Sequence, residues 1–347
     1  MQAMPRPPAL TDSWTLGSVR VPNRVLLAPL AGIGNWFVRL QAKRYGAGMA
    51  VSEMVSSHAI HYGNEKTCTE MLRIDPRERE TGPVSVQLFG EDPAMMRAAA
   101  AHVARLGVDA IDINMGCPVA KVQKTGAGAA LLADPDRAVA VARATVEGAR
   151  EAAEREVPVT VKLRSGLRDG DTSGFELAHR LVAEAGVAAI AFHPRSAAVH
   201  HKGAPDYELV ARLVDSLPAP VILTGGLNDA AGVREAFRQT GVEAVMLARG
   251  ALGNPWLFAE LVHGRELEPT RDEVVAELDW IIDRAVEHLG VGRATRYLRK
   301  FYPWYVSRLR LESSASRRLQ ESLQSAETIE QARALLDVAR DAVAVAG

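Results

Sequence analysis

The stretch Gly107-Val-Asp-Ala-Ile-Asp-Ile-Asn114 has the pattern of a strand that is buried in a parallel sheet. A glycine precedes a short apolar run, and the run ends at a polar residue. The same glycine stands at Gly186 before Val187 and at Gly241 before Val242. Glycine commonly ends a helix, and nearly continuous apolar runs are typical of parallel strands that are covered on both faces. The pattern therefore predicts helices that alternate with buried parallel strands.

Working outward from this stretch, the same alternation extends from Asn23 to about Phe258. Eight strands are predicted at Arg24–Pro29, Met49–Met54, Val84–Leu88, Ala110–Asn114, Val159–Leu163, Ala188–Phe192, Pro220–Leu223 and Ala244–Leu247. The segments between them carry apolar residues at helical spacing. Eight strand and helix units over about 240 residues favour an α/β fold of the TIM (β/α)8 barrel type, with a doubly wound open sheet as the alternative.

Outside the barrel, the composition changes at both ends. Residues 1–13 begin with a Pro-rich stretch and are expected to form a flexible tail, residues 14–262 form the barrel, and residues 270–345 form a small helical bundle. Capping boxes are predicted at Thr270 with Glu273 and at Thr328 with Gln331. Helices in this domain are predicted over Arg271–Leu289, Arg293–Leu311 and Ala315–Leu323, with a last helix after Thr328.

Charge and cysteine content exclude several classes of protein. The 347 residues include 41 Lys or Arg and 42 Asp or Glu, a formal net charge of −1, which argues against a surface that is basic throughout but leaves room for a local basic patch. Two cysteines, Cys68 and Cys117, are too few for a disulfide framework. No run of about 18 apolar residues predicts a membrane span, and no signal peptide is indicated. We therefore expect a cytoplasmic protein.

Two glycine-containing turns indicate a phosphate site. Gly225-Gly226 follows the seventh strand, and Arg249-Gly250 follows the eighth. Barrels often bind phosphate at these strand ends through backbone amides, and a guanidinium can pair with the anion. Each glycine can instead simply serve a tight turn, but finding both pairs at the expected strands weakens that alternative. A phosphate-bearing cofactor or substrate is predicted.

Other polar residues follow the fourth, fifth and sixth strands. Lys162 is costly to bury unless its ammonium meets an acceptor, so it is interpreted as a Schiff-base lysine, as a cation beside a flavin, or as a lysine that reaches solvent. Cys117 stands between Gly116 and Pro118, where a thiol at the barrel mouth is favoured over a buried apolar filler. His193 and Arg195 are open to a functional or a structural interpretation.

Taken together, these residues resemble the tRNA-dihydrouridine synthase family, and most closely its DusB-like bacterial branch. The similarity is carried by Asp112–Pro118 (DINMGCP), Lys121, Lys124, Gly126–Ala129, Val161–Gly166 (VKLRSG), Arg249–Trp256 (RGALGNPW) and Arg299–Tyr305 (RKFYPWY). It covers residues from about 14 to about 340 of the chain. The resemblance implies a flavin enzyme that acts on RNA.

The resemblance implies a barrel that holds FMN, which NADPH reduces while bound only transiently. Matching cofactor positions are Pro29, Leu30, Ala31, Gly32, Gln87, Lys162, His193, Gly225, Gly226, Arg249 and Gly250. Asn114 is expected beside flavin and uracil, and further substrate contacts are expected from Lys121, Lys124, Arg195, Arg296, Arg299 and Lys300. Cys117 matches the proton donor.

The implied reaction reduces specific uridines in tRNA to 5,6-dihydrouridine. Hydride goes from reduced flavin to uracil C6, and a proton goes from Cys117 to C5, so that no metal is needed. A uridine in folded RNA has to swing out of its stack to reach the flavin. We expect tRNA and NADPH as partners, no membrane, and a monomer.

The helical domain has an independent sign of an RNA surface. Between Arg293 and Arg318 there are eight Arg or Lys residues and one acidic residue, Glu312, a local net charge of +7. Interleaved aromatic residues are Tyr297, Phe301, Tyr302, Trp304 and Tyr305. Basic and aromatic groups together fit RNA contact, although we expect most of these aromatics to pack the bundle core.

The sequence departs from the family pattern at a few positions near the site. Leu30 stands where Met is common, Gly34-Asn35 where Thr-Asp is common, Pro194 where Gly is common, and Thr224-Gly225-Gly226 where Asn-Gly-Asp is common. These changes affect flavin packing and the loop that carries His200, His201 and Lys202, which contacts RNA or is simply solvated. They leave the implied hydride and proton chemistry intact.

Three other functions stay open on the sequence alone. The first is an FMN oxidoreductase that acts on a free pyrimidine or on another RNA such as rRNA. The second is a metal-free lyase with Lys162 as the Schiff base, and the third is a catalytically idle RNA-binding protein. The basic helical domain argues against a free pyrimidine, and intact Cys117 and Lys162 argue against the idle protein.

Overall fold

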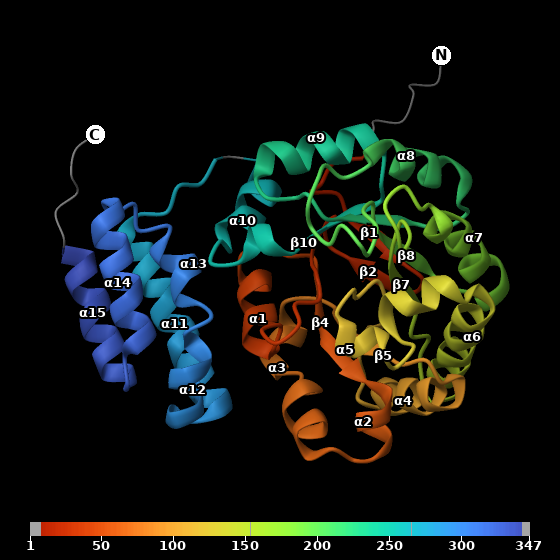
Figure 1. Ribbon diagram of the computed structural model, residues 1–347, viewed down its shortest axis with the longest axis horizontal. Coiled ribbons are helices and arrows are strands. Elements are labelled where there is room, and N and C mark those ends of the chain that lie inside the picture. Colours follow the sequence, from red (N-terminus) through yellow and green to blue (C-terminus); the bar gives the residue numbers. More distant parts are fainter. Residues whose placement is uncertain (1–7, 153, 265, 342–347) are drawn as a thin grey trace.

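The computed structural model describes residues 8–152, 154–264 and 266–341. In this part of the chain, eight parallel strands close into a barrel in the order β10-β3-β4-β5-β6-β7-β8-β9 (Figure 1). The barrel closes where β10 (Ala244–Leu247) pairs with β3 (Val25–Leu27), with Val245 beside Val25. The predicted TIM barrel is therefore confirmed, and the open doubly wound sheet is wrong.

The other barrel strands and the helices between them follow the predicted alternation. The strands are β4 (Met49–Ser56), β5 (Val84–Phe89), β6 (Ala110–Met115), β7 (Val159–Arg164), β8 (Ala189–His193) and β9 (Val221–Thr224). The helices are α1 (Trp36–Arg44), α2 (Ser57–His61), η1 (Thr67–Met71), α3 (Pro76–Glu80), α4 (Pro93–Arg105), α5 (Ala120–Gln123), η2 (Gly128–Ala133), α6 (Pro135–Ala152), α7 (Ser173–Ala185), α8 (Tyr207–Ser216), α9 (Ala230–Thr240), η3 (Arg249–Ala251) and α10 (Trp256–His263). Gly107, Gly186 and Gly241 all have positive φ angles, between 65° and 75°, as expected for glycines that end helices.

The sequence patterns miss a hairpin that precedes the barrel. Strands β1 (Trp14–Leu16) and β2 (Val19–Val21) pair antiparallel, and their buried side chains form one apolar cluster with Leu26, Met49 and Met246. Strands of three residues are too short to show a period in the sequence. Of the expected N-terminal tail, residues 1–7 lie outside the described ranges, whereas Leu10 is buried and its carbonyl accepts from Arg24 N at 2.9 Å.

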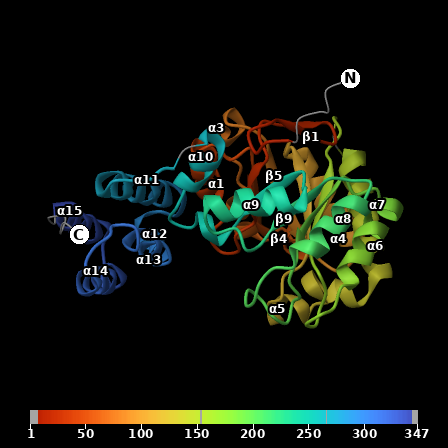
Figure 2. The same cartoon turned by 90° about the horizontal axis from the view of Figure 1, so that it is seen from above.

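The C-terminal helices form a separate group to one side of the barrel (Figures 1 and 2). They are α11 (Arg271–Leu289), α12 (Val291–Leu298), α13 (Tyr302–Val306), α14 (Ser313–Ser325) and α15 (Ile329–Asp341). Both predicted capping boxes form, with Glu273 N 3.3 Å from Thr270 Oγ1 and Gln331 N 3.1 Å from Thr328 Oγ1. Residues 342–345 of the predicted domain lie outside the described residues. In the described part, no helix is long and apolar enough to cross a bilayer.

The predicted continuous helix over Arg293–Leu311 is wrong. The chain leaves the helical path after Leu298 and resumes in α13, where Pro303 lies in the first turn. Proline has no N–H and its ring clashes with the preceding turn, so it is tolerated at a helix start and not in a helix interior. Arg310, at a φ of 49°, ends the segment before Leu311. Phe301, Tyr302 and Tyr305 are buried as expected, but not only by the bundle: the Phe301 ring lies 6.5 Å from Phe37 of α1, and Tyr305 OH accepts from Gln41 Nε2 at 2.7 Å.

A buried ion pair joins α1 to the segment that follows β4. Arg39 and Glu78 are 1% and 0% exposed, and two hydrogen bonds of 2.7 and 3.0 Å join the guanidinium to the carboxylate. Arg39 also donates to Gly34 O at 3.0 Å and to Arg73 O at 2.8 Å. This one side chain therefore fixes three segments, including the loop between β3 and α1.

Glu78→Gln is expected to destabilise the fold strongly. The substitution leaves the Arg39 charge buried without a carboxylate, at a cost of about 3–5 kcal/mol in the free energy of unfolding. Urea unfolding at pH 7 measures the loss. Glu235→Gln, which removes the exposed partner of Arg238, is the control and should leave the midpoint unchanged. Equal midpoints for both variants would show that the buried pair does not stabilise the barrel.

Candidate active site

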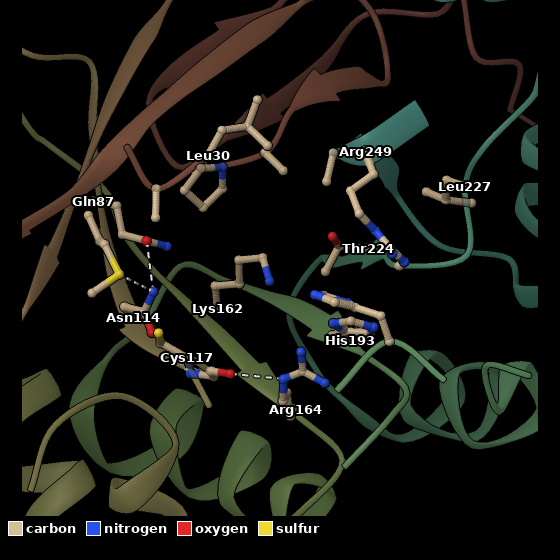
Figure 3. A pocket seen from close by; sticks show the side chains of 18 of the residues that line it. Leu30, Gln87, Asn114, Cys117, Lys162, Arg164, His193, Thr224, Leu227 and Arg249 are labelled. Atoms are coloured by element: carbon tan, nitrogen blue, oxygen red, sulfur yellow. Dashed lines mark hydrogen bonds between the residues drawn. The ribbon is translucent and has the colours of Figure 1, made fainter. Parts of the chain in front are cut away.

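A cavity of about 380 Å³ opens where the barrel strands end at their carboxyl termini (Figure 3). Eleven of the predicted site residues line it: Pro29, Leu30, Ala31, Gln87, Asn114, Cys117, Lys162, His193, Gly225, Gly226 and Arg249. They come from every strand of the barrel except β4, which contributes Met54. Residues from distant parts of the sequence therefore meet in one polar cavity.

Other predicted site residues lie outside this cavity. Gly250 packs behind it, since a Cβ there would lie 2.5 Å from Leu227 O. Lys121 and Lys124 are exposed at α5, and Arg195 is buried, with its guanidinium donating to Gly203 O at 2.8 Å. Gly32, Arg296 and Lys300 line a neighbouring cleft. Arg299 is half-buried within the helical domain, where it donates to Ala326 O at 3.3 Å.

A chain of hydrogen bonds orients the polar side chains at the mouth. Asp112 is fully buried on β6 and accepts from Thr160 Oγ1 and, at 2.6 Å, from Gln87 Nε2. Gln87 Oε1 in turn accepts from Asn114 Nδ2 at 2.9 Å. Burial raises the pKa of Asp112 to about 6, although these donors and the Lys162 ammonium oppose the rise. The buried carboxylate thus sets the orientation of the Asn114 amide.

Asn114 holds the loop that carries the cysteine. Its Oδ1 accepts from Gly116 N at 3.2 Å and from Cys117 N at 2.9 Å, while Cys117 O accepts from Ala129 N at 3.1 Å. Gly128 lies directly beneath, and a Cβ there would be 2.9 Å from Cys117 O. The half-buried Cys117 side chain lines the cavity beside Asn114 (Figure 3).

Arg164 is a site residue for which the sequence patterns predict no role. Its buried guanidinium donates to Gly116 O at 2.9 Å, to Ser196 O at 3.0 Å and to His200 O at 2.8 Å. One side chain therefore joins the cysteine loop to the loop after β8. A signal was present, because Arg164 lies two residues after Lys162 and so on the same face of β7.

Positive charge and neutral imidazoles share the cavity wall. Burial, followed by the Arg164 charge, lowers the pKa of Lys162 to about 8. Burial and the charges of Lys162 and Arg164 hold the pKa of His193 far below its ordinary value, so this imidazole is neutral. His201 stacks on it with centroids 6.0 Å apart, and burial lowers its pKa to about 4. The cavity therefore favours an anionic group near Lys162.

Two glycines after β9 form a cradle that no other residue fits. Gly225 has a φ of 94°, and a Cβ there would lie 2.3 Å from His193 Nε2. Gly226 has a φ of 83°, and its Cβ would lie 2.7 Å from Tyr207 OH. Arg249 lines the same end of the cavity and has no carboxylate partner among the described residues. Exposed amides beside an unpaired guanidinium can bind a phosphate.

The loop between β3 and α1, residues 28–35, forms another wall and is held by the helical domain. Tyr297 OH accepts from Asn35 Nδ2 at 2.6 Å, and Lys300 Nζ donates to Gly32 O at 3.1 Å. Gly32 N donates to Glu53 Oε2 at 2.8 Å. Glu53 lies on β4 where the register with β5 shifts. The helical domain therefore positions one wall of the cavity.

In the part of the chain that the structure describes, no group of three or more His, Cys, Asp or Glu side chains could hold a metal ion. The polar groups of the cavity are instead amides, cations, two imidazoles, a hydroxyl and one thiol. That set suits an organic ligand with an anionic group.

Comparisons with known proteins find a family and relatives that match most of the chain. The family model for dihydrouridine synthase (Dus) matches residues 26–343. The tRNA-dihydrouridine synthase B of Pseudomonas aeruginosa is 35% identical over 301 residues, which cover 85% of this chain and 87% of the relative. That of Vibrio cholerae serotype O1 is 34% identical over 317 residues, with 90% and 95% covered.

Solved structures with low sequence identity share the fold. A morphinone reductase mutant in complex with tetrahydroNAD has a TM-score of 0.54 at 16% identity, covering 75% of this chain and 92% of that one. A 2-naphthoyl-CoA reductase complex has a TM-score of 0.57 at 15% identity, covering 74% and 52%. The match of the family model to most of the sequence, together with relatives at 35% identity over most of its length, shows that the chain belongs to the dihydrouridine synthase family.

Proposed function

We propose that this protein reduces specific uridines in tRNA to 5,6-dihydrouridine, with a bound FMN and with NADPH as the reductant. Residues 14–262 form the FMN-binding barrel and residues 270–345 the RNA-binding domain of a monomer that acts in the cytoplasm. The observation that carries this proposal is the hydrogen-bond chain from Asp112 through Gln87 to Asn114, which presents Cys117 at the mouth of a cavity lined by Lys162.

The residues of the cavity fit FMN. The Gly225-Gly226 cradle and Arg249 would hold its phosphate, because a backbone without Cβ atoms lies there beside an unpaired guanidinium. Lys162 would place a cation where negative charge collects when the flavin is reduced. Membership in the dihydrouridine synthase family supports the same cofactor. When bound and reduced by NADPH, FMN supplies the hydride that is added to uracil C6.

The protein itself supplies the proton for uracil C5 and fixes the position of the thiol that donates it. Cys117 gives its thiol proton to C5, so that one hydride and one proton together saturate the C5–C6 bond. Asn114 fixes the backbone of the cysteine loop through two accepted hydrogen bonds, and Arg164 holds the same loop at Gly116 O. The thiol therefore meets the base from a fixed position and needs little reorganisation in the transition state.

Two of the eight basic residues between Arg293 and Arg318 are paired with carboxylates. Arg293 pairs with Glu70 and Arg310 with Glu268. Arg296 and Lys300 are exposed and line the cleft next to the cavity. Their position next to the cavity supports Arg296 and Lys300, rather than the half-buried Arg299, as contacts to the RNA around the target uridine.

Deleting the gene in its host and mapping dihydrouridine across total RNA tests the proposal. Loss at defined tRNA positions, restored by the wild-type protein, is the expected result. Loss in rRNA instead would assign the other RNA as substrate. No change in either RNA, with activity on a free pyrimidine, would assign the small-molecule reaction and contradict the proposal.

Cys117→Ala is expected to slow uridine reduction by about a hundredfold or more, because the general acid is missing. The variant should keep its flavin absorbance and its reduction by NADPH, since the proposed phosphate site is formed by Gly225, Gly226 and Arg249 and not by Cys117. Single-turnover dihydrouridine formation is the measurement. Cys68→Ala, at an exposed cysteine outside the cavity, is the control and should match wild type. A Cys117→Ala enzyme with wild-type turnover would remove the thiol from the reaction.

Gly225→Ala is expected to prevent FMN binding. The new methyl group would overlap His193 Nε2, and the backbone would need a positive φ that alanine rarely adopts. The measurement is FMN per purified protein, expected to fall at least about tenfold, as for a loss of about 1.4 kcal/mol or more in binding. Gly232→Ala on α9, where the nearest atom lies 3.3 Å away, should retain FMN. Full FMN content in Gly225→Ala would place the phosphate elsewhere.

A further inference from the structure

A second cavity of about 310 Å³ lies between the barrel and the helical domain; we refer to it as the interdomain cleft. Its barrel side is formed by the β3–α1 loop, the β4 end and η1, and its other side by the end of α11 and by α12. Its volume falls within the range of small-ligand sites, about 300–1,000 Å³. Of its lining residues, Arg296 and Lys300 are already proposed as RNA contacts, whereas Lys66 has no role so far.

The carboxylates in the cleft are already engaged. Glu70 forms two hydrogen bonds with Arg293, at 2.6 and 2.7 Å, and Glu53 accepts from Gly32 N at 2.8 Å. Arg293 therefore contributes little net charge.

The remaining cations are not engaged by carboxylates. Lys66 and Arg296 form no hydrogen bond or ion pair with other side chains among residues 8–152, 154–264 and 266–341, and both are exposed. Lys300 has a single hydrogen bond to a backbone carbonyl, Gly32 O at 3.1 Å. The cleft lining thus holds four Lys or Arg residues and two carboxylates, a net charge of +2 that favours an anion from outside the protein.

Its position relates the cleft to the active-site cavity. Gly32 lines the cleft, while Pro29, Leu30 and Ala31 line the active-site cavity, so that one short loop separates the two. When one uridine of a polynucleotide lies in the active-site cavity, the adjoining nucleotide lies close to this loop, either over the interdomain cleft or away from it. The cationic side is the one that stabilises a phosphate.

We propose that the interdomain cleft binds the phosphodiester of a nucleotide next to the target uridine, with Lys66 from the barrel and Arg296 from α12 as the phosphate contacts. This inference rests on the proposed function. It adds Lys66 to the substrate-binding residues and assigns the barrel side of the interdomain cleft to the RNA-binding surface. Lys300 of the helical domain connects the two sides of the cleft, because it lines the proposed phosphate site and donates a hydrogen bond to Gly32 O of the barrel.

The test uses FMN-loaded full-length enzyme and tRNA purified from a strain that lacks the gene. Lys66→Gln should raise the Kd about fivefold at 0.1 M salt and lower the slope of log Kd against log salt by about 0.9, the value for one lost phosphate contact. Lys66→Arg should retain the wild-type slope. Arg150→Gln removes one exposed charge from α6, on the opposite side of the barrel (Figure 1), and should change neither quantity.

Each other result has a definite meaning. Lys66→Gln with wild-type affinity and slope would overturn the cleft as a phosphate site. Slower flavin reduction by NADPH with unchanged tRNA affinity would assign the cleft to the dinucleotide and also overturn it. A wild-type enzyme that forms no dihydrouridine would overturn the proposed function itself, and this failure is recognised without any variant.

Discussion

The buried carboxylate of Asp112 is the interaction on which the active-site geometry depends. An ionised carboxylate has no proton to donate and can only accept hydrogen bonds. Thr160 and Gln87 therefore both have to donate to it. The nitrogen end of the Gln87 amide is then fixed, its oxygen receives Asn114 Nδ2, and the Asn114 oxygen is left to face Cys117 N. The charge of Asp112 thereby fixes which of two flipped orientations the side-chain amides of Gln87 and Asn114 adopt.

This arrangement has a cost that depends on pH. Burial raises the folded-state pKa of Asp112 to about 6, above its ordinary value of 3.8, so its contribution to stability is present at low pH and is lost as the pH rises through about 6. At neutral pH the barrel holds a carboxylate that would be more stable in water. An apolar residue would remove this cost, but it would also leave Gln87 and Asn114 free to turn.

Whether a feature could be predicted from the sequence depends on how far apart along the chain the contacting residues lie. The strands could be predicted because each is a short apolar run, several of them preceded by a glycine that ends a helix. Cys117 could be predicted because it lies in the seven-residue motif Asp112–Pro118. The role of Arg164 could not, because the carbonyls that its side chain binds belong to residues 32, 36 and 48 positions away. The hairpin of β1 and β2 could not either, because strands of three residues are too short to show a period. Gly34 and Asn35 look like minor departures in the sequence. In the structure, a Cβ at Gly34 would lie 2.9 Å from Leu30 O, and Asn35 donates to Tyr297, which an aspartate could not do.

The same distinction applies to the charge of the helical domain. Counting residues treats every Arg and Lys between Arg293 and Arg318 as available, whereas the fold pairs Arg293 with Glu70, pairs Arg310 with Glu268 and turns Arg299 toward Ala326. What remains beside the cavity is a small set of directed cations, and Lys66 joins it from the distant barrel sequence. Because each phosphate contact adds only about 0.9 to the salt dependence, a few such contacts give modest non-specific attraction. A chain with a net charge of −1 therefore has to discriminate among RNAs through shape and through the position of these contacts around one uridine.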